Sequence, residues 1–462
     1  MKRQRYILIL ASLFLVACGG GSAPEPITTA PATTAPEPNP YLWQEASPDS
    51  VNMDAAALSA AFDQAFADGT YTQAALVIKD GMLVYERYRG ILASEEAVLA
   101  NTLPPDSQSI DSLYGRRDKD SLASSWSTAK SFVSVLVAIA IEQGFIESTE
   151  QSASDFIEEW RGDERNQVSI RNLLDMRSGL ELVCLNNDTR LLERCSDDSS
   201  GTGGNLVFAD NQLDACISRS LAETGVRQPW YRFGPTYEAG YWVYSNCDTM
   251  VLGEILFRAT GQDLETFADV NLFSKIGMQA HWWQDNDPTG QVDGNYLAYC
   301  CLDATPRDFA KFGQLLLNNG LWDGEQVVPQ SYVAAIRNIT QDSVLIEQFA
   351  GSFSYGLKFW TISPQIQSDG SLFPAANSIY STIGFDGQYI MIDFENNMLV
   401  VRNSLYHPAL NRSDERKMKI DMTNLQGSNY VATLPAGTGM NTGSSYNNGA
   451  LLYQVTKSIN TP

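Results

Sequence analysis

Histidine is almost absent from this chain, which contains only His281 and His407. A zinc site is not expected, because zinc ligand sets usually combine histidines with paired cysteines, and no Cys-x-x-Cys spacing occurs here. The sequence also lacks Gly-x-Ser-x-Gly, the turn that presents the serine in many hydrolases with a histidine base. A Ser-His-Asp enzyme using His407 therefore stays an alternative without its usual signature. No metal and no cofactor are predicted.

Basic residues are scarce. The chain has 31 Lys and Arg against 54 Asp and Glu, a formal net charge of −23 and a sequence pI of about 4.4. No basic stripe is present to offset repulsion from phosphate groups, so nucleic acid is excluded as a partner. The acidity is typical of a solvated, soluble surface.

An apolar run long enough to cross a bilayer is also missing at the N-terminus. Residues 6–16 are apolar but too short to span comfortably, and they follow the basic start Met1 to Arg5. The run ends in Leu-Val-Ala-Cys, which has the form of a lipobox with Cys18 as the lipidated residue. We therefore predict a lipoprotein signal peptide over 1–18 and a lipid-anchored protein of the cell envelope, at the outer membrane or the periplasmic face. A plain secretory signal is the alternative.

The next segment, 19–45, is rich in Pro, Thr and Ala and has little to bury, so it predicts an extended tether. Residues 46–462 are expected to form the folded domain. Six cysteines remain after Cys18, an even number in an exported chain, which predicts disulfides. Of the fifteen possible pairings, only Cys184 with Cys195 is favoured, as a local loop closure.

Strand patterns stand at both ends of this domain. Residues 74–78 and 83–88 flank Asp80-Gly81, and residues 387–394 and 398–403 flank a polar turn, so each pair predicts a hairpin. Helical spacing is present over 53–67, 168–176, 250–260, 308–319 and 449–459. The pattern predicts an α/β (α+β) fold, in which an antiparallel sheet flanked by helices packs against an all-helical lobe inserted at about 148–370. A cleft is expected at the seam.

Ser127-Thr128-Ala129-Lys130 is the most informative motif, and the only Ser-x-x-Lys in the chain. Residues three apart on a helix share a face, so the serine hydroxyl and the lysine amine are expected to touch. The apolar run that follows, 132–141, predicts a buried helix. Burial lowers a lysine pKa, which makes Lys130 a candidate base for a Ser127 nucleophile whose oxyanion is held near the helix N-terminus. The alternative is a solvated lysine at an ordinary helix start.

A Ser–Lys pair needs a third group to pass the proton to the leaving atom. Tyr244-Ser245-Asn246 supplies a phenol for that relay, easier to ionise beside a cationic amine, and an amide that can bind the lysine or the substrate carbonyl. Tyr-x-Asn recurs at Tyr446, but Tyr244 is preferred because its flank runs into the helix at 250–260. An ordinary buried aromatic is the alternative reading of Tyr244.

The order of these motifs resembles a known superfamily. Ser-x-x-Lys is followed by Leu-Leu-x-Met-x-Ser-Gly-Leu at 173–180, Tyr-x-Asn, a Thr-Pro-Arg-Asp-Phe-Ala-Lys-Phe-Gly helix at 305–313 and a Gly-rich strand entry. This arrangement is similar to the serine β-lactamases and penicillin-binding proteins, and within them to class C β-lactamase-related esterases and 6-aminohexanoate-dimer hydrolases. The resemblance implies that Ser127 acylates, Lys130 deprotonates it and Tyr244 relays the proton.

The third family element departs from the usual pattern. Where the family has Lys-Thr-Gly or His-Thr-Gly, this chain has Ser381-Thr382-Ile383-Gly384, followed by Phe385 and Asp386. A carboxylate there would repel the carboxylate of a β-lactam. Similarity to the nylon-oligomer enzymes implies the Phe385 N–H as a second oxyanion donor, with Gly384 allowing close approach. The alternative is that Gly384 and Gly387 only shape a bend.

The leading prediction is an exported serine hydrolase that cleaves a small-molecule ester or amide through an acyl-enzyme. A β-lactamase or D-alanyl-D-alanine carboxypeptidase is the first alternative, which would require Arg402 or another arginine to replace the missing cation. A non-catalytic binding protein on the same fold is the second. Trp282, Trp283 and Tyr296 either line an apolar pocket or pack in the core.

Overall fold

The computed structural model describes the chain in sections. These are residues 42–100, 115–181, 183–185, 192–194, 206, 209, 211–221, 244–285, 294–339, 355–362, 365–366, 372–373, 379–385, 387–404 and 448–460. All of them fall within one compact unit, residues 36–462. The predictions for Cys18, Cys195, Asp386, His407 and Tyr446 lie outside the described residues.

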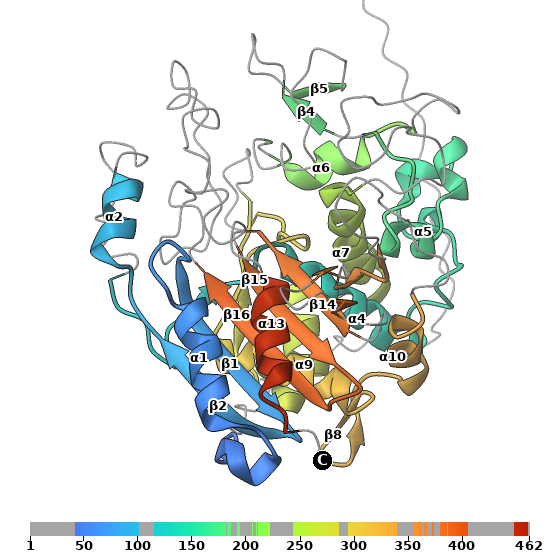
Figure 1. Ribbon diagram of the computed structural model, residues 1–462. Coiled ribbons are helices and arrows are strands. Elements are labelled where there is room, and N and C mark those ends of the chain that lie inside the picture. The colour runs from blue at the N-terminus through green and yellow to red at the C-terminus, as the bar shows by residue number, and fades with distance from the viewer. Residues whose placement is uncertain are drawn as a thin grey trace, which may run out of the picture. The chain divides into compact units, whose positions relative to one another are not determined.

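A seven-stranded antiparallel sheet is the centre of the unit (Figure 1). Its strand order is β10-β11-β14-β15-β16-β1-β2. The strands are β1 (Thr72–Lys79), β2 (Met82–Tyr88), β10 (Tyr355–Gly356), β11 (Phe359–Thr361), β14 (Ile379–Gly384), β15 (Gln388–Asp393) and β16 (Met398–Ser404). The N-terminal and C-terminal hairpins join through β1 and β16, whose register pairs Val77 with Val400.

Both predicted hairpins are present, and their turns explain why. Asp80 and Gly81 have φ of 52° and 79° in the β1–β2 turn, the left-handed pair that a two-residue hairpin requires. Asn397 has φ of 46° in the β15–β16 turn, a conformation that asparagine tolerates well. The folded part begins slightly before the predicted boundary at residue 46, because Trp43 is buried and the Gln44 carbonyl accepts from the Leu83 N–H.

One face of the sheet is covered by the two terminal helices. These are α1 (Ala55–Ala65) and α13 (Asn448–Lys457), which lie side by side across the strands (Figure 1). Both follow the predicted helical patterns at 53–67 and 449–459. They enclose an apolar cluster with side chains from β1, β15 and β16, including Leu58, Phe62, Val77, Met391 and Leu452.

The opposite face is covered by α4 (Ala129–Glu142) and α9 (Pro306–Leu317). A Cβ at Gly313 of α9 would stand 2.9 Å from Ile390 Cγ2 and 3.0 Å from Leu399 Cδ2, so glycine lets this helix lie close on the sheet. The helix starts earlier than the predicted 308 because Thr305 caps it by accepting from the Asp308 N–H. Every residue of α4 from Ala129 to Ala140 is buried, as its apolar run predicts.

Between α4 and β14 lies a mainly helical block that also carries short strands. Its helices are α5 (Ile170–Leu174), α6 (Gln212–Ile217), α7 (Asn246–Thr260), α8 (Leu264–Ala268) and α10 (Gln330–Ile336). Helix α7 packs against α4, α5 and α6. A small sheet has the strand order β3-β7-β6 (Ala123–Ser124, Leu302–Ala304, Ala280–Trp282), and its strand β3 directly precedes the Ser127 segment. Other described elements are α2 (Ala93–Ala100), β4 (Val183–Leu185), β5 (Leu192–Arg194), β8 (Leu321–Trp322), β9 (Glu325–Gln326), β12 (Gln365–Ile366) and β13 (Leu372–Phe373).

The architecture confirms the predicted α/β class, an antiparallel sheet with helices on its faces and a helical block beside it. The boundaries predicted for the signal peptide, the linker and the inserted lobe stay predictions. In the described part of the chain, no helix is both long and apolar enough to cross a membrane.

Candidate active site

Ser127 lies in a single turn of 3-10 helix, Trp126–Thr128, which leads directly into α4. The preceding residue Ser125 fixes this turn to β7, since its N–H donates to the Leu302 carbonyl at 2.8 Å and its hydroxyl accepts from the Leu302 N–H at 2.9 Å. Trp126 has φ of 47°, a left-handed conformation uncommon for a bulky residue. The hydroxyl of Ser127 is thus held in a fixed place on a half-buried residue.

Lys130 lies one turn further along, and its side chain is 1% exposed. Its Nζ donates to Ser127 Oγ at 2.8 Å and to the Tyr299 carbonyl oxygen at 2.8 Å. The predicted contact between residues three apart is therefore present. The alternative of a solvated lysine is wrong, because the amine is enclosed by protein.

Burial lowers the pKa of Lys130 well below its ordinary value, and the positive charge of Lys358 lowers that pKa further. An amine with a depressed pKa carries a free lone pair over a larger part of the neutral pH range. It can then accept the Ser127 proton across the existing hydrogen bond.

Tyr244 stands on the other side of the pair, just before α7. Its phenol is hydrogen-bonded to Ser127, and Lys130 Nζ lies 5.0 Å from the centre of its ring. Burial raises the pKa of Tyr244 above its ordinary value, and the hydrogen bond to Ser127 only partly opposes this rise. The expectation of an easily ionised phenol is thus wrong, because an amine that is itself driven to the neutral form gives little charge to stabilise a phenolate. Tyr244 is placed to relay a proton as a neutral phenol.

The end of strand β14 lies against the Ser127 turn. Thr128 Oγ1 and Thr382 Oγ1 are 3.2 Å apart, and Thr128 Oγ1 also donates to the Gln388 carbonyl at 3.2 Å. A Cβ on Gly384 would stand 2.2 Å from the Ser125 carbonyl oxygen, so only glycine permits this approach. Phe385 follows, with its ring centre 5.5 Å from that of Trp126 in an edge-on contact. Gly384 therefore does more than shape a bend, and the Phe385 ring packs against the residue beside Ser127.

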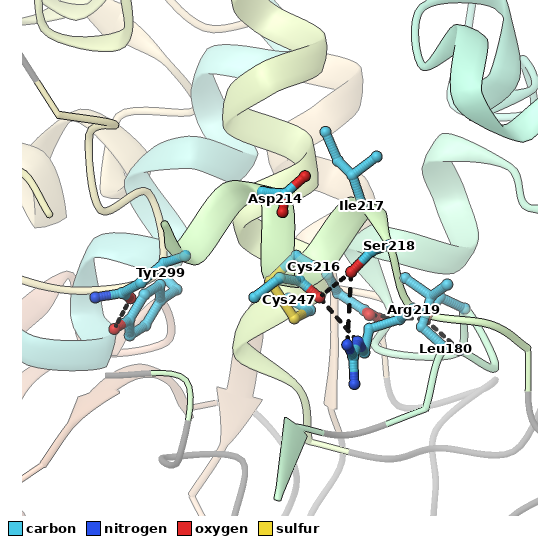
Figure 2. The surroundings of a disulfide bond; sticks show 12 residues. Leu180, Asp214, Cys216, Ile217, Ser218, Arg219, Cys247 and Tyr299 are labelled. Carbon is cyan, nitrogen blue, oxygen red and sulfur yellow. Dashed lines mark hydrogen bonds between the residues drawn. A yellow bond between two sulfur atoms is a disulfide. The ribbon is translucent and has the colours of Figure 1, made fainter. Parts of the chain in front are cut away.

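Asn246 opens α7 and is 8% exposed. The next residue, Cys247, forms a disulfide with Cys216 of α6, which ties the start of α7 to its neighbour (Figure 2). In the same region the Tyr299 hydroxyl donates to Gln212 Oε1 of α6 at 2.7 Å. Cys300 and Cys301 form a second disulfide directly after Tyr299. A disulfide-bonded cysteine therefore follows each of two tyrosines at the site. Cys247 comes shortly after Tyr244, and Cys300 directly follows Tyr299, whose carbonyl oxygen accepts a hydrogen bond from Lys130.

Other groups around the site were missed at the sequence level. The Tyr299 carbonyl is a backbone atom and leaves no sequence signal. The aromatic rings of Tyr355 and Trp360 pack on Tyr244, with ring centres 6.3 Å and 5.7 Å away. Lys358 and Asp248 are both enclosed, and the charge of Lys358 acts on Lys130. An acidic residue just before the apolar part of α7 is a signal that would have pointed to Asp248.

Several residues considered from the sequence are engaged elsewhere. Arg402 is fully buried and donates to the Thr70 carbonyl, to Thr72 and to Asn448. It does not supply the missing cation. His281 is on strand β6, and its Nδ1 lies 3.2 Å from Glu265 Oε1 of α8. Trp282 and Trp283 are buried core residues. Among the described residues, no three His, Cys, Asp or Glu side chains gather in a way that would hold a metal.

Comparison with known proteins agrees with this geometry. The Beta-lactamase family profile matches residues 58–419. A 6-aminohexanoate-dimer hydrolase of Paenarthrobacter ureafaciens is 24% identical over 286 residues, which are 60% of this chain and 64% of that protein. The chain thus matches a little under two thirds of that relative's length.

Two solved structures share the fold. One, from Bacillus anthracis and provisionally assigned as a 6-aminohexanoate-dimer hydrolase, has a TM-score of 0.54 at 21% identity and covers 85% of this chain and 87% of its own. The other is EstCE1, a hydrolase with promiscuous acyltransferase activity, with a TM-score of 0.52 at 13% identity over 89% and 99% of the two chains. With a family match over most of the sequence and a Ser–Lys–Tyr cluster on the matching fold, the chain belongs to the Beta-lactamase family of serine hydrolases.

Proposed function

We propose that the protein hydrolyses a small carboxylic ester or amide through an acyl-enzyme on Ser127. The observation that carries this proposal is the 2.8 Å contact between Ser127 Oγ and the enclosed Nζ of Lys130. The names of the relatives support it, since one is a 6-aminohexanoate-dimer hydrolase and another a hydrolase with acyltransferase activity. An acyltransferase and a hydrolase differ only in what accepts the acyl group from the serine.

The proposed reaction follows from the contacts at the site. Lys130 Nζ takes the proton of Ser127 while Oγ attacks the substrate carbonyl carbon. The backbone N–H groups of Ser127 and Phe385 stabilise the oxyanion, near the N-terminus of α4. Tyr244 passes a proton to the leaving oxygen or nitrogen. Lys130 gives its proton to Tyr244 and is neutral again. Water then attacks the acyl ester while losing a proton to Lys130, and this proton passes to Ser127 Oγ as the acid is released.

A β-lactamase or carboxypeptidase activity on peptidoglycan-like substrates is the second candidate. These substrates carry a carboxylate, and Arg402, the cation considered for binding it, is occupied by the Thr70 carbonyl and the Thr72 and Asn448 side chains. Burying a carboxylate without a cationic partner is costly. The esterase or amidase reading is therefore preferred.

Labelling and turnover test the proposal together. The wild-type protein is expected to be labelled by a fluorophosphonate probe and to hydrolyse p-nitrophenyl acetate or butyrate faster than a chromogenic cephalosporin. Ser127→Ala should abolish both labelling and turnover, whereas Ser121→Ala, in the preceding loop, should leave both unchanged. Absence of labelling in the wild type would favour a binding protein, and cephalosporin turnover with no ester turnover would favour the β-lactamase.

Export and lipid anchoring through Cys18 are part of the same proposal. The basic start, the short apolar run and the Leu-Val-Ala-Cys sequence support it. The wild type is expected in the membrane fraction of expressing cells and to incorporate a labelled fatty acid. Cys18→Ser should remove the label, and a wild type without the label would contradict the anchor.

A further inference from the structure

The turn between β10 and β11 has an unusual backbone for its residues. Leu357 and Lys358 have φ of 49° and 64°, so both lie in the left-handed region. Glycine adopts this region at no steric cost, whereas a side chain there is strained by of order 1–3 kcal/mol. Lys358 therefore occupies a position where glycine would cause less backbone strain.

Hydrogen bonds fix this turn from two sides. The hydroxyls of Ser131 and Ser134 on α4 donate to the carbonyls of Lys358 at 2.7 Å and of Leu357 at 2.6 Å. On the other side, the Lys358 N–H donates to the Leu174 carbonyl at 3.1 Å, and the Leu357 N–H donates to Asp175 Oδ1 at 2.8 Å. Since Ser131 directly follows Lys130, the Lys358 backbone is attached to the helix beside the candidate base.

The Lys358 side chain is 1% exposed, and in the described part of the chain its Nζ has no hydrogen-bond partner. The nearby acid is Asp248 of α7, which is fully buried. Asp248 Oδ1 accepts from Ser178 Oγ at 2.7 Å, and its Oδ2 has no partner among the described residues. An enclosed ammonium without a direct hydrogen bond is costly, and the attraction of Asp248 and Asp175 offsets part of that cost.

We propose that Lys358 is a positioning residue whose buried ammonium repels a second positive charge on Lys130 and so keeps the amine of Lys130 free to take the Ser127 proton. This inference rests on the proposed role of Lys130 as base. In this arrangement Asp248 stabilises the charge of Lys358, and the turn bonded to α4 fixes its distance from Lys130.

The electrostatic surroundings agree with this arrangement. Within the described sections, the titratable groups facing Lys130 are Lys358 and the phenols of Tyr244 and Tyr299, both of which burial keeps protonated. Lys358 faces Asp248 and Asp175, and Arg171 pairs with Asp175. Burial lowers the pKa of Lys358 to about 8, against the attraction of the two carboxylates, which favours its charged form. Like charges at short range favour the neutral form of one partner.

The test measures the rate of fluorophosphonate labelling against pH. Labelling needs a neutral Lys130, so it should rise with pH as Lys130 loses its proton. In Lys358→Met and Lys358→Gly the repulsion is gone, the pKa of Lys130 rises, and the midpoint of the acidic limb should move up by about one pH unit. Labelling at any pH below the wild-type midpoint should then fall by about tenfold, and it should recover at higher pH. Glycine suits the left-handed backbone at this position. The measurement therefore relies on Lys358→Gly if Lys358→Met folds in low yield.

Lys311→Met is the matched control. Lys311 is also buried, but its ammonium is bonded to Asp308 Oδ1 at 2.8 Å on α9, and it does not contribute to the pKa shift of Lys130. Its pH profile should match that of the wild type. An unchanged midpoint in the folded Lys358 variants, an equal loss at every pH, or the same shift in Lys311→Met would each overturn the inference. A wild type that is not labelled at any pH would instead overturn the proposed function.

Discussion

The two faces of the central sheet are built for different purposes. The face under α1 and α13 encloses an apolar cluster of residues such as Leu58, Phe62 and Leu452. The face under α4 and α9 is also largely apolar, but buried polar groups adjoin it, among them Lys130 of α4 and Thr382 of β14. Because both faces share the same strands, the first can supply stability while the second holds groups that cost stability.

This division explains how an enclosed amine is tolerated. Burying an ionisable group without a counter-ion costs free energy, and the chain accepts that cost at Lys130, whose side chain is 1% exposed. Substitutions on the α1/α13 face should therefore change the free energy of unfolding without changing catalysis, and substitutions of the polar groups beside the other face should lower catalysis. The following variants test that comparison.

Lys130→Met should have the largest effect. Removing the candidate base is expected to lower kcat/KM for a p-nitrophenyl ester by about three orders of magnitude or more, while the methionine fills a similar volume in an apolar site. The midpoint of urea unfolding should stay the same or rise. A variant that retained most of its activity would show that Lys130 is not the base.

Leu452→Ala, on α13, should affect only stability. Its side chain is fully buried, and truncating such a leucine costs about 2–5 kcal/mol of unfolding free energy. Urea denaturation followed by circular dichroism measures this loss, and kcat/KM of the remaining folded protein should equal that of the wild type. A clear fall in kcat/KM would mean that the two faces are coupled.

Gly384→Ala should reduce activity through geometry alone. The added methyl group would stand 2.2 Å from the Ser125 carbonyl oxygen, so either β14 or the Ser127 turn has to move. A displacement near 1 Å typically costs about 100-fold in rate. Gly162→Ala is the control, because no atom lies within 4 Å of its added methyl group, and its kcat/KM should be unchanged.

Thr382→Val should have the smallest effect. The hydroxyl lies 3.2 Å from Thr128 Oγ1 and accepts from the Ile390 N–H at 3.2 Å. Losing one such buried contact is expected to cost about 1 kcal/mol in unfolding free energy and a few-fold in kcat/KM. A loss as large as that of Gly384→Ala would indicate that the hydroxyl itself takes part in the reaction.

Local patterns predicted much of the fold and half of the site. The β1–β2 hairpin follows from apolar strands around Asp80-Gly81, and the contact between Ser127 and Lys130 follows from helix periodicity. The motif order added Tyr244 by resemblance. In each case the information lies within a few residues or in the order of motifs.

What the sequence did not reveal depends on distant segments meeting. Spacing alone could not select Cys216 with Cys247 and Cys300 with Cys301 from the possible pairings, because a disulfide depends on three-dimensional proximity. The left-handed backbone of Lys358 and its attachment to Ser131 likewise depend on how the β10–β11 turn meets α4. The neutral character of Tyr244 follows from its burial, which a motif does not encode.

The bond between Cys216 and Cys247 has a practical consequence for protein chemistry. It joins residues that are 31 positions apart in sequence, and Tyr244 lies within the enclosed stretch, just before Cys247. A protease cut anywhere between the two cysteines would leave both fragments covalently attached, as one band on a non-reducing gel and two after reduction. A nicked protein would then keep the Tyr244 segment tethered to α7 and would run as intact protein on a non-reducing gel.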